Sequence, residues 1–301
     1  MKRVSRGDWL LSAATGAAVL LVLSSLVAIL VAIVVRGAPV LSAKFVFGSP
    51  GADPADGGLL PVILGTVACT LLMTVACVPL GVTTAVWLSE YAPRGSALAG
   101  IVRSAIRNLA AVPSIVFGLF GLGFFVLFVG GKLDSAFYPQ ATGPVFARPA
   151  ILWSSLTLAL LTLPVVVVTT EEALRTIPRD VREAAFALGA TRLQVVWRVV
   201  LPHAKSGIWT GVILAVSRGA GEVAPILFTG VVGWQSHAPT DARDGFMHLG
   251  NHVYLLATQA PDVERAQPAL YGTVVLLLLL TFSLNIAAVI LRHRSRAGAR
   301  A

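Results

Sequence analysis

Residues 171–205 read EEALRTIPRDVREAAFALGATRLQVVWRVVLPHAK, a charged segment rich in helix-forming residues. The stretch before it, at 150–169, is apolar and uncharged, and the stretch after it, at 207–230, is largely apolar. Each of these stretches reaches the roughly 20 residues that a helix needs to cross the hydrocarbon core of a bilayer. We therefore predict that residues 171–205 join two transmembrane helices on one side of a membrane.

Four further stretches have the length and apolarity of membrane spans, and they lie at 10–35, 60–88, 112–130 and 268–291. None of the four contains Asp, Glu, Lys or Arg. Charged residues make up 12% of the 301-residue chain, whereas soluble domains carry roughly 25%. We therefore predict an all-α, polytopic membrane protein with six transmembrane helices in a single domain, residues 1–301.

The basic residues are distributed unequally between the two sides that six spans define. Of the 23 Lys and Arg residues, 16 lie at the termini and in the loops on their side, six lie in the other loops, and Arg218 lies inside the fifth span. Loops rich in Lys and Arg remain in the cytoplasm, so both termini and residues 171–205 are predicted to be cytoplasmic. The net charge of +9 then follows from topology, and no nucleic-acid partner is expected.

The cytoplasmic segment contains its own helix signals. Pro178 followed by an acidic residue, Asp180, predicts a helix start, and Gly189 predicts its end because glycine readily takes the left-handed conformation there. A second short helix is predicted at 191–200, ending at Pro202. Two short helices joined at a glycine form a compact protrusion that can enter a groove of another protein. On composition alone, an amphipathic helix lying on lipid headgroups is an equal alternative.

Eight residues of this segment occur at a spacing that favours the protrusion. They are Glu183, Ala184, Ala185, Leu188, Gly189, Ala190, Leu201 and Pro202. They resemble the EAA loop of ABC importer permeases, in which this loop is the coupling helix that docks on a cytoplasmic ATPase. The resemblance implies the type I, MetI-like permease fold and the docking role for these residues. Val199 stands where the family pattern has isoleucine.

The chain contains no G-x-x-x-x-G-K-[ST] phosphate-binding loop. It is therefore not expected to hydrolyse ATP by that route or to bind a cofactor, and it is not expected to be an enzyme. The resemblance implies that ATP and Mg²⁺ bind to the partner ATPase.

Arg218 and Glu222 place two charges inside the fifth span. A charge at the bilayer centre costs at least about 2.5–3.5 kcal/mol, so such residues usually face protein or water and serve a function. Their i, i+4 spacing places them on one helical face, close enough to pair. Arg218 is a candidate for lining an anion path because its planar fork suits an oxyanion. A purely structural salt bridge that fixes helix packing is the alternative.

The residues around this pair carry a second resemblance. SRGAGEVAPILFTG at 217–230, PLGVTTAVWLSEYAPRG at 79–95 and VPSIVFGLFGLGFFV at 112–126 are similar to stretches of the PstA-type phosphate permeases. That family usually has GETAP where this chain has GEVAP, so Val223 replaces a threonine and removes a hydroxyl near the proposed path. The sister PstC permeases differ after the GE pair.

This resemblance implies a bacterial inner-membrane subunit that moves inorganic phosphate into the cytoplasm. Its implied partners are a PstC-like permease, a dimer of PstB-like ATPases and an extracytoplasmic PstS-like phosphate-binding protein. A permease for phosphonate, sulfate or molybdate remains an alternative. A self-contained secondary transporter is a further alternative, although no internal repeat supports it. A membrane hydrolase is disfavoured because no catalytic set is present.

Two further patterns resemble parts of a metal site or a disulfide but lack the remaining features. His248 and His252 have the four-residue spacing of metal ligands, yet no clustered carboxylate or cysteine accompanies them. We interpret them as ordinary loop residues and expect no metal site. Cys69 and Cys77 lie eight positions apart in one apolar stretch, too far apart along a helix for a disulfide. We interpret both cysteines as buried apolar residues.

Overall fold

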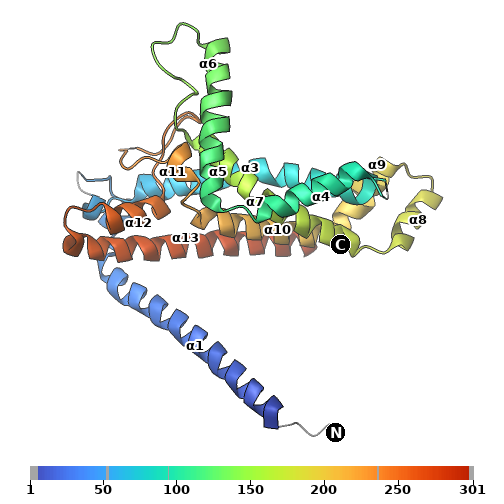
Figure 1. Ribbon diagram of the computed structural model, residues 1–301, viewed down its shortest axis with the longest axis horizontal. Coiled ribbons are helices and arrows are strands. Elements are labelled where there is room, and N and C mark those ends of the chain that lie inside the picture. Colours follow the sequence, from blue (N-terminus) through green and yellow to red (C-terminus); the bar gives the residue numbers. More distant parts are fainter. Residues whose placement is uncertain (1–5, 52–53, 94, 236, 298–301) are drawn as a thin grey trace.

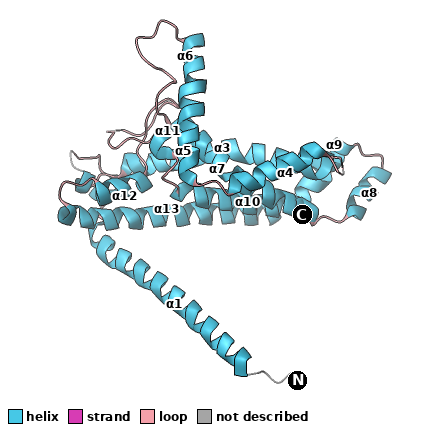
Figure 2. Ribbon diagram, in the orientation of Figure 1, coloured by secondary structure: helices cyan, strands magenta, loops and turns pink. Residues whose placement is uncertain are grey.

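The computed structural model describes residues 6–51, 54–93, 95–235 and 237–297, and these residues are mostly helical (Figure 2). The α-helices are α1 (Arg6–Gly37), α2 (Ala43–Phe47), α3 (Leu60–Val86), α4 (Ala97–Ala110), α5 (Ser114–Gly121), α6 (Gly131–Phe137), α7 (Ile151–Arg175), α8 (Arg179–Ala187), α9 (Arg192–Val195), α10 (Leu201–Gly221), α11 (Ile226–Thr229), α12 (Leu249–Thr258) and α13 (Val263–Ala297). Three π-helical segments extend or join them, and these are Trp87–Tyr91, Leu122–Gly130 and Val196–Val200. Two single 3₁₀ turns lie at Ala38–Val40 and Pro54–Asp56.

Six helical runs in the described part of the chain are long and apolar enough to cross a membrane. They are Trp9–Val40, Leu60–Tyr91, Ser114–Phe137, Ile151–Arg175, Arg192–Gly221 and Val263–His293. The predicted fold class, an all-α protein with six membrane helices, is therefore confirmed.

Helix α7 forms the centre of the bundle and is the most buried of the six runs. It packs against both α3 and α10. Small residues allow this close approach: a β-carbon at Gly81 of α3 would meet the Val166 side chain, and one at Gly211 of α10 would meet Thr169. Cys69 and Cys77 are free thiols in the core cluster between these helices, as predicted.

Helix α13 runs alongside α10 (Figure 1) and is joined to it by polar contacts. The Nδ2 of Asn285 donates to the Ser217 hydroxyl at 3.2 Å, and a guanidinium N–H of Arg292 donates to the Thr210 hydroxyl at 3.2 Å. The two bonding residues of α13 are seven positions apart, and so are the two bonding residues of α10, so both bonds lie on the same interface. Hydrogen bonds of this kind fix the register of helices that lipid alone would not hold.

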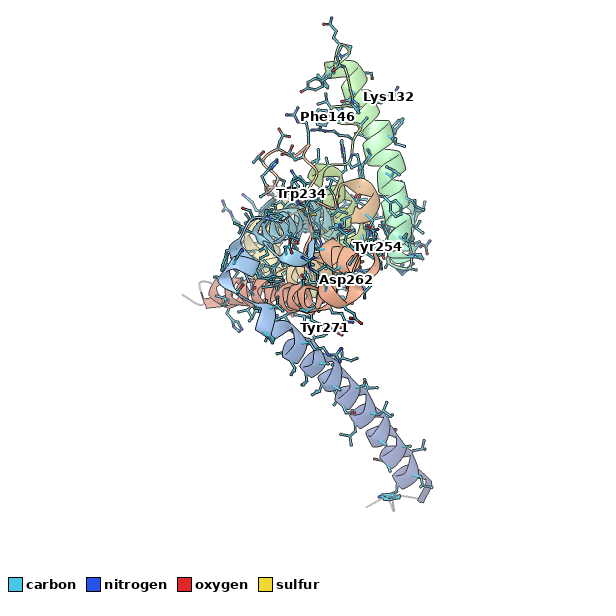
Figure 3. All side chains as sticks on the ribbon, turned by 90° about the vertical axis from the view of Figure 1, so that its left-hand side faces the viewer. Lys132, Phe146, Trp234, Tyr254, Asp262 and Tyr271 are labelled. Atoms are coloured by element: carbon cyan, nitrogen blue, oxygen red, sulfur yellow. The ribbon has the colours of Figure 1, made fainter. Side chains whose placement is uncertain are left out.

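Two helical segments extend away from the bundle. Figures 1 and 3 show α1 descending from the bundle on one side and the α5–α6 run projecting on another. The apolar length of α1 is wholly unburied. Its contact with the bundle lies at its end, where Arg36 donates to the Tyr271 hydroxyl of α13 at 2.7 Å. The apolar surface of α1 therefore faces away from this subunit, whereas Phe117 and Gly121 of α5 and Val126 beyond it are buried against the bundle.

The fifth span differs from the prediction at both ends. We predicted a short helix at 191–200 that stops at Pro202, followed by a span at 207–230. In the structure one continuous run extends from Arg192 to Gly221. A proline inside an α-helix meets the carbonyl four residues earlier, and the π-helical turn Val196–Val200 changes the backbone path just before Pro202. The proline is thus accommodated, and the helix continues.

The C-terminal end of this span comes earlier than predicted because the backbone becomes extended at Glu222, with φ −81° and ψ 129°. Pro225 contributes to the break, since a proline disfavours helical geometry in the residue before it. The four-residue helix α11 follows. Arg218 and Glu222 therefore lie at the end of a helix, and not in the middle of one.

Candidate functional site

The segment between the fourth and fifth spans forms a small exposed protrusion around α8. We call its exposed residues, Glu183, Ala184, Phe186, Leu188 and Gly189, the α8 tip. The Leu188 side chain is 89% exposed, and that of Phe186 is also exposed. Adjacent exposed apolar side chains outside the membrane spans are typical of a protein contact surface. The α8 tip therefore has the character of a docking surface.

The turn that ends α8 depends on Gly189, as predicted. Gly189 has φ +82°, in the left-handed region, and its N–H donates to the Phe186 carbonyl at 2.9 Å. Thr191 then caps α9 in a capping box with Gln194. Ala185 and Ala190 face the other way and pack against a buried apolar cluster. The turn thus holds the α8 tip outward while its inner side is anchored.

A largely, though not fully, buried ion pair fixes α8 to the rest of the molecule. Arg182 lies 2.8 Å from Glu90 at the end of the α3 run, and the two side chains are 17% and 11% exposed. Arg182 also donates to the carbonyls of Leu174, in the last turn of α7, and of Ile177, just after it, at 2.9 and 2.7 Å. One guanidinium therefore links α8 to the C-terminal ends of the α3 run and of α7.

A second arginine strengthens this junction. The guanidinium of Arg192 donates to the backbone carbonyl of Glu90 and lies 5.0 Å from the centre of the Tyr91 ring. Residues of this junction and of α8, among them Glu90, Arg192 and Phe186, line one cleft of about 890 Å³. Sequence reasoning missed Glu90 and Arg182 because the two residues lie 92 positions apart and no local pattern connects them.

Leu201 and Pro202 were predicted to share the docking role, but the structure places them elsewhere. They open α10 and are separated from the α8 tip by α9 and the π-helical turn. Leu201 lines an apolar groove together with Leu193 and Trp197. The remaining members of the predicted set lie together on α8 and the turn that follows it.

The predicted contact between Arg218 and Glu222 is confirmed. Arg218 Nε lies 3.4 Å from Glu222 Oε1. The side chains are 39% and 22% exposed, so the pair is open on one side and is not sealed inside the bundle. Arg218 occupies the last turn of α10, where the helix dipole favours a cation.

Arg218 lies on a face that α10 shares with α7. The side of α10 that carries Gly211 packs against α7, and the side that carries Ser217 contacts α13. Between these two sides lie the exposed residues Leu214 and Arg218. Helix α7, which packs against α10, exposes Val168, Glu172 and Arg175. We call this strip, Leu214, Arg218, Val168, Glu172 and Arg175, the α7–α10 face.

The two histidines differ from the prediction because both are buried rather than exposed in a loop. His248 caps the start of α12, accepting the Gly250 N–H on Nδ1 at 3.1 Å. Burial lowers the pKa of His248 to about 4, so its ring is neutral at physiological pH. No group of three or more His, Cys, Asp or Glu residues is placed for a metal among the described residues.

Comparison with known proteins defines the class to which this fold and site belong. Residues 77–297 match the family described as binding-protein-dependent transport system inner membrane component. The chain belongs to this family. Two solved transporters share the fold. One is a bacterial alginate ABC transporter, with a TM-score of 0.67 and 16% identity over 98% of this chain and 96% of that one. The other is the methionine transporter MetNI, with a TM-score of 0.60 and 19% identity over 79% and 95%.

Within the family, the chain is similar to proteins named as phosphate permeases. It is 30% identical to the probable phosphate transport system permease protein PstA of Methanocaldococcus jannaschii, over 88% of this chain and 86% of that protein. It is 36% identical to PstA of Haemophilus influenzae, over 70% of each chain. It is also 32% identical to YqgI of Bacillus subtilis, a probable ABC transporter permease, over 77% of this chain and 78% of that protein. The resemblance to PstA-type permeases is thereby confirmed.

Proposed function

We propose that this chain is the PstA-type permease subunit of an ATP-driven importer that moves inorganic phosphate into the cytoplasm. The observation that carries the proposal is the 30% and 36% identity to two proteins named PstA. The exposed guanidinium of Arg218 on the α7–α10 face adds chemical support, because arginine binds tetrahedral oxyanions through paired N–H donors. Phosphonate, sulfate and molybdate are the alternative substrates that a test must separate.

In this proposal the nucleotide chemistry takes place on other subunits. A dimer of PstB-like ATPases binds ATP and Mg²⁺ and receives the α8 tip, and this chain binds no cofactor. A PstC-like permease pairs with it in the membrane, and a PstS-like protein delivers phosphate from outside. The exposed Leu188 and the unburied α1 support the need for protein partners.

The proposed orientation places both termini in the cytoplasm of a bacterial cell, with the protein spanning the inner membrane. The excess of Lys and Arg on one set of loops supports it. Figure 1 adds that α1 begins and α13 ends toward the same end of the molecule as α8.

Cysteine labelling tests this orientation. In a background without Cys69 and Cys77, a cysteine at Ala242, exposed between α11 and α12, is expected to react with an impermeant thiol reagent added to intact cells. A cysteine at His293, exposed near the end of α13, is expected to react only after the cells are opened. The opposite pattern would overturn the orientation.

Reconstitution tests the substrate. The four-component complex in proteoliposomes is expected to take up labelled phosphate only when ATP is present on the ATPase side. Unlabelled phosphate should compete, whereas equal concentrations of a phosphonate, sulfate or molybdate should not. Uptake of another oxyanion in preference to phosphate would replace phosphate in the proposal, and uptake without the ATPase would favour a secondary transporter.

A further inference from the structure

A cavity of about 220 Å³ lies between α4 and α7 at the cytoplasmic side of the bundle. Its lining combines a few apolar residues with five charged ones, which are Arg103, Arg107, Glu171, Glu172 and Arg175. Three arginines converge on one hollow from two different helices. Such convergence of planar N–H donors is the chemistry that recognises an oxyanion.

Part of this charge is already committed within the chain. One carboxylate oxygen of Glu171 accepts from Arg103 Nε at 3.0 Å and from an Nη of Arg175 at 2.7 Å. The Glu171 side chain is only 12% exposed. It therefore anchors the two guanidiniums from the buried side of the cavity. Arg103 is further fixed by a bond of 2.9 Å to the Leu88 carbonyl. The cluster is therefore ordered before any ligand arrives.

The remaining charge faces the cavity. Arg107 is exposed and donates to the Ser104 hydroxyl at 3.1 Å, an uncharged partner. Three arginines against two glutamates leave the lining with a net charge of +1. A guanidinium carries five N–H donors, so Arg107 and Arg175 retain donors beyond the bonds described. An anion in the cavity can therefore be bound without breaking the Glu171 contacts.

The cavity lies at one end of the α7–α10 face. Val168, Glu172 and Arg175 belong both to that face and to the cavity lining. Gly219, next to Arg218, approaches Thr162 of α7. Arg218 is therefore separated from Arg175 by about 13 residues of helix, roughly 20 Å at 1.5 Å per residue. The two arginine positions bracket a strip whose exposed residues between them are mainly apolar.

We propose that this cavity is a transient binding site for inorganic phosphate on its way from the α7–α10 face to the cytoplasm. The inference rests on the proposed function of the chain. A site on a conduction path must bind its ion well enough to admit it and weakly enough to release it. Glu171 and Glu172 serve the second requirement, because they offset most of the arginine charge and keep the affinity low.

Binding of inorganic phosphate to the purified chain in lipid nanodiscs, followed by the ³¹P line width, tests the site directly. Arg107→Gln combined with Arg175→Gln is expected to weaken binding by about tenfold or more, since charge-assisted hydrogen bonds are lost. Glu171→Gln is expected to tighten it severalfold. Arg198→Gln removes a charge from an exposed position outside the cavity and is expected to leave binding unchanged.

Equal weakening by Arg198→Gln would show a general charge effect and overturn the site, as would unchanged binding in the double variant. If Glu171→Gln does not fold, the comparison of the double variant with Arg198→Gln still decides. The proposed function is tested separately. If the wild-type complex takes up phosphate and the double variant does so with the same kinetics, the proposed cavity site is refuted and the proposed function stands. No phosphate uptake by the wild-type complex would remove the function.

Discussion

Replacing Arg218 and Glu222 together with glutamine is expected to lower the rate of phosphate uptake by about 10–100-fold, the equivalent of one lost hydrogen bond to a charged group. The double variant removes both charges and keeps similar side-chain bulk. The pair is open on one side, so its removal is expected to leave insertion, assembly and ATP hydrolysis intact. The measurement is ATP-dependent uptake of labelled phosphate by the reconstituted complex, normalised to the amount of assembled complex.

The double variant separates a transport role from a packing role. A structural salt bridge would be dispensable once both charges are gone, because neither leaves an unpaired partner behind. Near-normal uptake by a well-assembled double variant would therefore assign the pair to helix packing. The matched control is Arg265→Gln with Asp56→Asn, which removes an exposed pair between α13 and the turn before α3. We expect that control to transport phosphate normally.

Replacing Gly189 with valine is expected to uncouple transport from ATP hydrolysis. Gly189 has φ +82°, and a β-branched residue held there costs on the order of 1–3 kcal/mol. A β-carbon at this position meets no atom within 4 Å, so the penalty comes from the backbone alone. The α8 tip should then adopt other orientations, and uptake should fall about fivefold or more while the spans remain intact.

Gly189→Asn is the matched control for this experiment, since asparagine adopts positive φ far more readily than valine. We expect Asn to keep most of the uptake and most of the copurification with the ATPase. If Val and Asn behave alike, side-chain size or polarity is the cause and the backbone argument fails. Normal uptake and ATPase association in the valine variant would remove the docking role of the α8 tip.

Local signals in the sequence were sufficient for the elements that depend on local physics. The six spans follow from apolar length, and α8 begins at Arg179 and ends before Gly189 as its proline and glycine indicate. The contact of Arg218 with Glu222 follows from their four-residue spacing. Each of these features is determined by residues within a few turns of one another.

Features that depend on distant residues or on backbone adaptation could not be predicted. Pro202 is a reasonable helix stop, yet a π-helical turn lets the helix continue past it. Glu90 and Arg182 come together only when the ends of α3 and α7 meet. The cavity arginines likewise come from separate helices. Periodicity and spacing carry no information about contacts between residues that are distant in the sequence.

The unbroken run from Arg192 to Gly221 has a mechanical consequence. It contains 30 residues, roughly 45 Å of helix, and joins α9 to Arg218 without a loop, although its path changes at the π-helical turn Val196–Val200. Thermodynamic reciprocity then requires that, if nucleotide binding below changes anion affinity at Arg218, anion arrival must change nucleotide affinity by the same factor. In such an importer, anion binding at Arg218 would change the nucleotide affinity of the ATPase before hydrolysis takes place.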